Sequence, residues 1–245
     1  MAKLECLFSV PLWEASSSIS VMKMLAQQAE ANIIREVKAV DEPDFITEDI
    51  IEDYLENEDG SYRQVWYTYY SCGSCVGNDV EEVKLQYVNL ITQLTRRSAF
   101  LTIFGLFEQR MSNCLELMIR LSGHTEILKG GMIEKTHDML TTIYGKKDIA
   151  DVDHLTIIRN IMAHADGVAH EYHQLLKMTR AKKDSEKRQL RAISKASEAI
   201  SVTCFNTVLL KNNFLNFAVD EISRYVEAIN STVQEYHKNK HRPLQ

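Results

Sequence analysis

The sequence contains very little proline, because Pro11, Pro43 and Pro243 are the only three and none occurs between residues 44 and 242. A sandwich or barrel of many short strands normally needs more turn-forming residues than that. The scarcity of proline therefore predicts a mainly helical chain. Apolar residues make up 45% of the 245 positions and charged residues 25%, which is typical of a globular protein and excludes a wholly disordered or collagen-like chain.

The sequence also lacks a disulfide framework and long apolar runs. Its five cysteines are an odd number and are widely scattered, unlike the paired cysteines of small secreted proteins. No stretch approaches the roughly 18 apolar residues of a membrane span, and the apolar run near the N-terminus is too short for a signal peptide. We therefore expect a cytoplasmic protein without a membrane partner.

Motifs for metals and cofactors are sparse. Cys72 and Cys75 form a single C-x-x-C motif, whereas a structural zinc site needs four ligands. His170 and His173 lie three residues apart without an obvious carboxylate or third ligand. Neither a phosphate-binding glycine motif nor a G-x-S-x-G motif occurs. We predict no metal and no cofactor.

Charge is distributed very unevenly along the chain. Residues 41–60 hold ten acidic residues and no Lys or Arg, so the remainder of the chain carries +4 although the whole carries -6. One interpretation of this segment is a solvated surface helix; the other is a region that repels or mimics nucleic acid, or screens a basic site. The helix interpretation depends on an apolar stripe formed by Phe45, Ile46, Ile50, Ile51, Tyr54 and Leu55.

The densest basic run covers residues 177–195, with eight Lys or Arg against two acids. It fits either a solvated helix face or a surface that binds a polyanion. Its candidate RNA-binding residues are Lys177, Arg180, Lys182, Lys183, Lys187, Arg188 and Arg191. Residues 237–242 add a short basic tail.

Hydrophobic periodicity and capping residues predict helices along most of the chain. A bend or break is expected near Arg96 and Arg97, because a continuous helix over residues 79–121 would be roughly 65 Å long. The aromatic segment 62–70 is predicted as a strand or a packed loop, and residues 200–210 as a possible short hairpin. We divide the chain into an N-terminal accessory region, 1–78, and a helical domain, 79–245. The expected helices cover residues 18–40, 79–121, 132–144, 151–165, 169–183 and 214–237.

The helix predicted to end near Ala165 carries the most informative pattern. On a helical wheel, its apolar residues fill one half, and Thr156, Arg159, Asn160, Ala163 and His164 fill the other. Gly167 is placed as a stop signal after the helix. The pattern fits an ordinary amphipathic helix. It also fits a helix that presents Arg, Asn and His together, with small residues between them that leave room for a phosphate.

The segment Arg159-Asn-Ile-Met-Ala-His164 resembles the signature of the HEPN (higher eukaryotes and prokaryotes nucleotide-binding) superfamily, in which an Arg is followed by four to six residues and a His, commonly with Asn directly after the Arg. The upstream segment Phe104-Gly-Leu-Phe107-Glu108 looks like the Phe-Glu segment of many members. The resemblance covers about residues 80–237 and implies a helical bundle of HEPN type.

The resemblance implies a metal-independent endoribonuclease, often a toxin or antiviral effector, that dimerises through the Arg159 and His164 face. RNA carries its own nucleophile, so cleavage by the 2′-OH would leave a 2′,3′-cyclic phosphate. Arg159 would bind the phosphate, His164 would transfer protons, and Asn160 would bind the phosphate or fix the His164 tautomer. Glu108 interrupts an apolar stripe, so it either reaches water at the edge of that stripe or orients Arg159 or Asn160.

Two other functional classes stay open at this point. The first is a non-catalytic HEPN-like module for dimerisation or partner binding, with an antitoxin or regulatory protein as a possible partner. The second is an unrelated helical interaction protein in which Arg159 and His164 are surface groups. Cleavage of RNA in the absence of metal would distinguish a nuclease from the first class. The geometry of the dimer would distinguish it from the second, because the family resemblance implies that the two His164 side chains face each other across a shared cleft.

Overall fold

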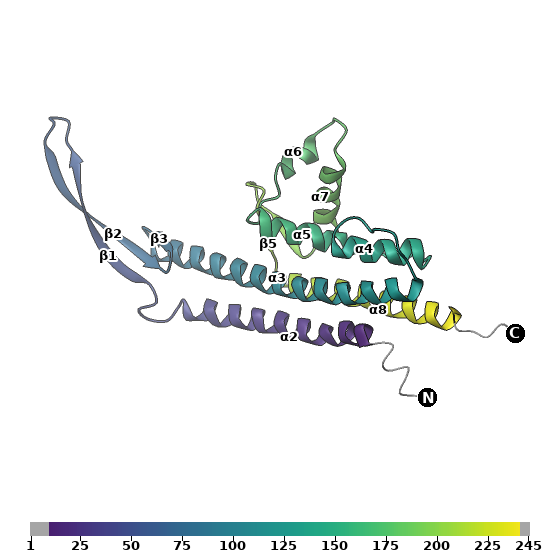
Figure 1. Ribbon diagram of the computed structural model, residues 1–245. Helices are drawn as coiled ribbons and strands as arrows, with labels where there is room; N and C mark the ends of the chain where they lie inside the picture. Colours follow the sequence, from purple (N-terminus) through teal and green to yellow (C-terminus); the bar gives the residue numbers. More distant parts are fainter. Residues whose placement is uncertain (1–9, 241–245) are drawn as a thin grey trace. The chain divides into compact units, whose positions relative to one another are not determined.

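The computed structural model describes residues 10–240 and is mainly helical, with small antiparallel sheets (Figure 1). The helices are α2 (Val10–Ala39), α3 (Val80–Ser122), α4 (Met132–Asp138), the π-helical turn η1 (Met139–Ile143), α5 (Asp153–His164), α6 (Tyr172–Lys177), α7 (Asp184–Lys195) and α8 (Phe214–Lys240). The strands are β1 (Thr47–Glu56), β2 (Tyr62–Cys72), β3 (Cys75–Gly77), β4 (Ile200–Val202) and β5 (Val208–Leu210). The prediction of a mainly helical chain is confirmed.

The described residues form two compact units. The larger contains residues 10–27 and 97–240, and the smaller contains residues 28–96. Helices α2 and α3 each contribute to both units. The division differs from the boundary predicted at residue 78, because the first half of α2 belongs to the larger unit.

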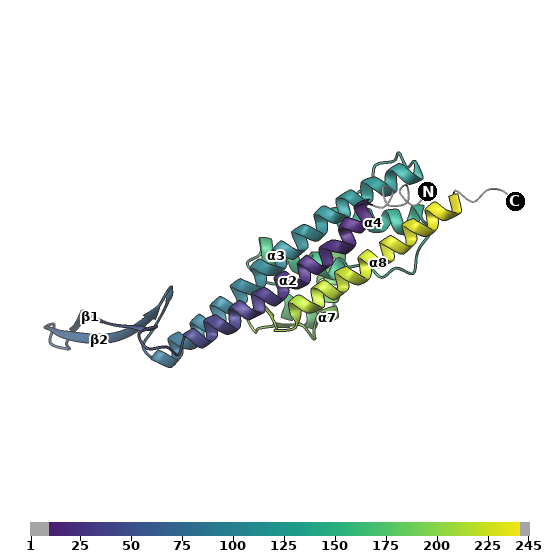
Figure 2. The same cartoon turned by 90° about the horizontal axis from the view of Figure 1, so that it is seen from below.

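The larger unit is built around three long helical segments. The first part of α2, the second part of α3 and α8 lie side by side (Figures 1 and 2). Their shared core is rich in aromatic rings that meet edge to face, such as Phe100 with Phe214 at 4.9 Å between ring centres. Phe104, Phe107 and Tyr225 are also fully buried there. This core supports the shorter helices that follow α3 along the chain.

Helix α2 begins earlier than predicted, at Val10 instead of Ser18. Pro11 is tolerated because the first turn of a helix has no intrahelical acceptor for its missing N–H. Leu12 and Ala15 are buried, and Glu14 forms an ion pair with Arg110 of α3 at 2.9 Å. Ser18, expected as a cap, instead donates its hydroxyl to the carbonyl of Ala15 within the helix.

The hairpin β4–β5 confirms the prediction for residues 200–210. Its strands pair Ile200 with Leu210 and Val202 with Val208. Val168, just after α5, forms a bridge with Thr207 of the hairpin loop. The hairpin thereby holds the chain that leaves α5.

The smaller unit contains a hairpin of β1 and β2 that runs through ten residue pairs, from Thr47↔Ser71 to Glu56↔Tyr62. The prediction of a strand over residues 62–70 is confirmed, and β3 adds a short third strand through Cys72↔Cys75. The prediction of a helix in the acidic segment is wrong. Its apolar residues recur at helical spacing, but the segment is extended because it pairs with β2. Local periodicity does not reveal that partner strand.

Two further helix predictions are corrected. Helix α3 runs without a break through Arg96 and Arg97, where a bend or break was expected. The predicted helix over residues 169–183 is reduced to α6, because the backbone at its start forms hydrogen bonds with a distant segment instead of helical ones. Ala169 donates its N–H to the carbonyl of Asn206, and Glu171 has a left-handed φ of 56°.

Candidate active site on helix α5

Helix α5 buries one face and exposes the other, as its sequence pattern predicts. Leu155, Ile158, Ile161 and Met162 are buried. On the opposite side Arg159 is half-buried, and Asn160, Ala163 and His164 are exposed. The helix therefore brings the three predicted polar site residues to one accessible surface.

The end of α5 is fixed by a tight turn. Asp166 and Gly167 both have positive φ, 48° and 78°, and the N–H of Gly167 donates to the carbonyl of Ile161 at 2.9 Å. A Cβ atom at position 167 would lie 2.3 Å from Nη2 of Arg97. A φ of 78° favours glycine, so the predicted stop signal is confirmed.

Arg159 is held by α3. Its Nη2 donates to Oε2 of Glu108 at 2.6 Å, and its Nη1 donates to Oδ1 of Asn160 at 2.9 Å. Its guanidinium also lies over the ring of Phe104, 5.4 Å from the ring centre. Three contacts from two helices thus fix a charge that remains 26% exposed.

Glu108 fits both interpretations given for it, an edge position that reaches water and a contact that orients Arg159. Its neighbours on α3, Phe104, Phe107 and Met111, are fully buried. The Glu108 side chain is 29% exposed, so it lies at the edge of the apolar stripe and still reaches Arg159. A carboxylate in this position stabilises and orients the guanidinium, because a charge-assisted bond is short and directional.

His164 is the last residue of α5 and is exposed. Near the same helix end lies Arg97 of α3, which the sequence pattern does not single out as a site residue. Its Nη1 donates to the backbone carbonyl and the carboxylate of Asp166, both at 3.3 Å. Its Nε is buried without a hydrogen-bond partner in the described part of the chain. The guanidinium of Arg97 therefore supports the turn that follows His164.

The basic run is divided by the structure into paired and exposed residues. Arg188 bridges Glu134 of α4 and Asp153 of α5. Arg180 bonds Glu186 at 2.8 Å and lowers the pKa of that carboxyl to about 2. Lys187 pairs with Asp184 at 3.2 Å and Lys182 donates to the carbonyl of Met178 at 3.0 Å. Lys177, Lys183 and Arg191 are exposed, and their side chains form no such bonds to acids within residues 10–240.

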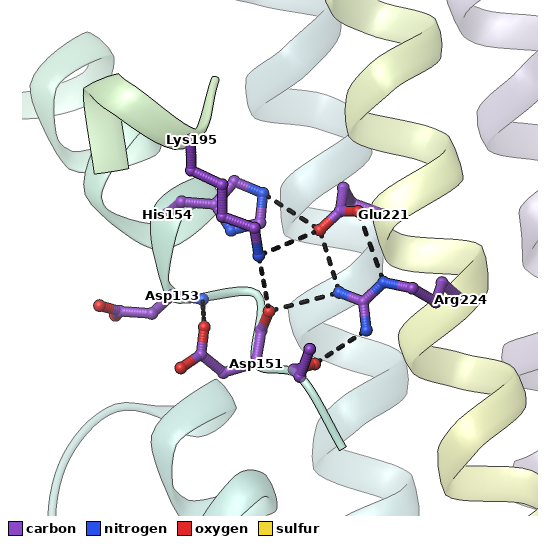
Figure 3. A network of polar contacts seen from close by, with 7 residues as sticks. Asp151, Asp153, His154, Lys195, Glu221 and Arg224 are labelled. Atoms are coloured by element: carbon purple, nitrogen blue, oxygen red, sulfur yellow. Dashed lines mark hydrogen bonds and ion pairs between the residues drawn. The ribbon is translucent and has the colours of Figure 1, made fainter. Parts of the chain in front are cut away.

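A polar network supports the start of α5 (Figure 3). Arg224 of α8 donates to the carbonyls of Ala150 and Asp151 at 2.9 and 3.3 Å, and Lys195 of α7 also reaches Asp151. Glu221 pairs with both cations, at 3.0 Å and 3.4 Å. The chain entering α5 is thus tied to two other helices.

His154 lies within this network and is almost fully buried, with Nε2 3.3 Å from Oε2 of Glu221. This contact is an ion-pair distance without hydrogen-bond geometry, since neither ring nitrogen has a hydrogen-bond partner in the described residues. Burial, with a smaller contribution from Lys195, lowers the pKa of His154 to about 4 against the opposing effect of Glu221. The side chain is therefore a neutral structural group at pH 7.

Cys72, Cys75 and His173 have structural surroundings. Cys72 and Cys75 are buried, and burial, with a smaller effect of Cys75, raises the pKa of the Cys72 thiol. His173 bonds the carbonyl of Thr203 at 2.8 Å. Within residues 10–240, no group of three or more His, Cys, Asp or Glu side chains is arranged to hold a metal ion.

In the described portion of the chain, no helix combines the length and apolar character needed to cross a membrane. His241 and Arg242, at the end of the predicted basic tail, lie outside the described residues, as does Cys6. No protein-family model, curated protein or solved structure matches the chain.

Proposed function

We propose that this protein is a metal-independent endoribonuclease of HEPN type, with Arg159, Asn160 and His164 as its catalytic residues. The observation that carries the proposal is the placement of these three residues on the side of α5 that is not buried, with Arg159 bonded to Asn160 and to Glu108. Toxin or antiviral activity belongs to the same proposal and is supported by the resemblance of the motif alone.

In the proposed reaction the 2′-oxygen of a ribose attacks the adjacent phosphorus, and the bond from phosphorus to the 5′-oxygen breaks. The proton of the 2′-OH passes to a base, and the leaving 5′-oxygen receives a proton from an acid. An imidazole can perform either transfer near neutral pH. The products are a 2′,3′-cyclic phosphate and a 5′-hydroxyl.

Arg159 would stabilise the negative charge that develops on the phosphate oxygens. Its fixed position favours this role, because a group held in place beforehand needs no reorganisation during the reaction. Glu108 is then a positioning residue, and Asn160 aligns the other side of the guanidinium. The 26% of the Arg159 side chain that is exposed is the part available to a phosphate.

One histidine cannot easily act as base and acid in the same step. A two-fold axis near α5 would bring a second His164 to the same cleft, and a homodimer through the Arg159 and His164 face is therefore part of the proposal. Lys177, Lys183 and Arg191 are the best candidates for contacts with the RNA backbone. Arg180 and Arg188 would first have to leave their carboxylates.

A non-catalytic module remains the second candidate, and one observation favours it. The guanidinium of Arg159 is already bonded to Glu108 and Asn160, so a phosphate would have to share it. In that case the same α5 surface would mediate dimerisation or bind a regulatory protein such as an antitoxin, without cleaving RNA.

The test is cleavage of mixed cellular RNA by the purified protein in a chelator. Arg159→Ala and His164→Ala should abolish cleavage while the chain stays folded. His170→Ala, which removes an exposed histidine outside α5, is the matched control and should cleave like the parent. Equal cleavage by all four proteins would refute the assignment.

A further inference from the structure

The β1–β2 hairpin carries three carboxylates that each lie directly across from an aromatic ring. The strand register pairs Glu48 with Tyr70, Glu52 with Trp66, and Glu56 with Tyr62. Paired residues of antiparallel strands point to the same face, and residues four apart along a strand share that face. We call these three pairs the acidic–aromatic face.

The acidic–aromatic face is open to solvent at Glu52 and Glu56, whereas Tyr70 is half-buried against Cys72, Cys75 and Val83. Lys84 lines a hollow together with Glu48 and Tyr70. Trp66 is 62% exposed and Tyr62 is 66% exposed, and all three glutamates are exposed. The one basic residue of the paired segments is Arg63, which pairs with Leu55 on the opposite face. Large exposed rings are unusual on a surface without a partner.

We propose that the acidic–aromatic face binds an extended, arginine-rich segment of another protein. A guanidinium stacks on an aromatic ring and at the same time donates a forked pair of hydrogen bonds to a carboxylate. Glu52 with Trp66 and Glu56 with Tyr62 each supply both halves of such a site, and Glu48 adds a third exposed carboxylate beside the half-buried Tyr70. Lysine fits less well, because its compact ammonium group neither stacks nor forks.

The spacing of the pairs sets the spacing of the ligand. Four residues along a strand correspond to roughly 13 Å. An extended peptide with arginine at every fourth position has the same repeat, so three arginines can meet the three glutamates, two of which stand across from exposed rings. The short bond from the Tyr54 hydroxyl to Glu52, at 2.6 Å, holds the central carboxylate on this face.

Charge separates this ligand from the other possible occupants. A second copy of the hairpin would bring the five acidic residues of β1 against the same five, and RNA would bring phosphates against them. Both are repelled by like charge. An isolated two-stranded hairpin is also only marginally stable in water, so a partner that covers this one would stabilise it.

Binding of synthetic peptides to the full-length protein, measured by fluorescence anisotropy at low salt, tests the proposal. The probe has three arginines separated by Gly/Ser spacers of three residues; the comparison peptides carry lysine at those positions or three consecutive arginines. We expect the spaced arginine peptide to bind about tenfold more tightly than either comparison peptide. Equal binding of the arginine and lysine peptides would overturn the proposal.

Matched variants locate the binding face. Glu48→Gln/Glu52→Gln and Asp49→Asn/Asp53→Asn each remove two charges from the same strand, but from opposite faces. The first should weaken binding by about tenfold or more and the second by less than about twofold. Equal losses would show nonspecific attraction to an acidic strand and would contradict the proposal.

The rings are tested in the same way. Trp66→Ala should reduce binding about tenfold, Trp66→Phe much less, and Tyr67→Ala on the opposite face hardly at all. Hydrogen exchange of the β1 and β2 amides checks that each hairpin is intact; Trp66→Phe keeps the test decisive if Trp66→Ala unfolds it. Dimerisation or RNA binding that depends on Trp66, without peptide binding, would instead assign this face to another occupant.

Discussion

Helix α5 and the β1–β2 hairpin both carry apolar residues, but α5 buries most of them and the hairpin leaves most of them exposed. Helix α5 buries Leu155 and Ile158 completely. The hairpin leaves Ile50 64% exposed and Ile51 51% exposed. The polar residues of α5 therefore stand on a packed support, as catalysis requires, whereas the surface of the hairpin is supported by one layer of strands and suits binding.

The first prediction concerns the aromatic core of the larger unit, which supports α5. Phe100 is fully buried between Phe104 and Phe214. Phe100→Ala should lower the free energy of unfolding by about 3–5 kcal/mol, because it removes buried apolar area and leaves a cavity. Urea unfolding followed by circular dichroism measures the change. A loss below about 1 kcal/mol would mean that the aromatic core is not tightly packed.

The second prediction concerns the buried histidine that supports α5. The pKa of His154 is about 4 in the folded chain and 6.5 in an ordinary histidine. Between these values the unfolded chain binds a proton that the folded chain does not, so stability is lost as the pH falls from about 6.5 towards 4. The loss should amount to about 3 kcal/mol.

Urea unfolding at several pH values checks this effect. His154→Leu should remove that part of the pH dependence, since no imidazole remains to take up a proton on unfolding. His164→Gln changes an exposed histidine and is the control that should retain it. If His154→Leu keeps the same pH profile, the destabilisation at low pH has another source.

The third prediction tests the contact between α3 and α5. Glu108→Gln keeps the shape of the side chain but removes the charge that holds Arg159. We expect kcat for RNA cleavage to fall by about a hundredfold with little change in KM, because a misplaced charge affects the transition state more than binding. Glu108→Asp should recover part of the rate. An unchanged kcat would make the pair purely structural.

The smallest effect on the free energy of unfolding is expected for an exposed apolar residue of the β1–β2 hairpin. Ile51→Ser should change the free energy of unfolding of the free protein by no more than about 0.5 kcal/mol, because the side chain is already in water. The measurement is the same urea titration as for Phe100→Ala. A loss of 2 kcal/mol or more would show that the hairpin packs against something in the free chain.

Local pattern predicted the elements that are stabilised by their own periodicity. The face of α5, its stop at Gly167, the strand around Trp66 and the hairpin 200–210 all follow from spacing, turn residues and β-branched composition. The pairing of Glu108 with Arg159 was one of two alternatives, because a carboxylate in an apolar stripe needs either a partner or water.

The features that sequence missed depend on distant residues. The strand β1 is specified by β2 and not by its own repeat. The sequence indicates Arg96 and Arg97 only as a place for a bend or break in α3. In the structure Arg96 donates two hydrogen bonds of 2.8 Å to the carboxylate of Glu30, and Arg97 supports the turn after His164. The neutral, buried state of His154 likewise comes from α7 and α8, which lie far along the chain.

The chemistry of the RNA ends tests the central claim most directly. Fragments produced by the protein in the presence of a chelator should carry 2′,3′-cyclic phosphates and 5′-hydroxyls, and none should form with His164→Ala. Fragments with 5′-phosphates, or cyclic ends that persist undiminished in His164→Ala, would contradict the claim that α5 carries a metal-independent ribonuclease site.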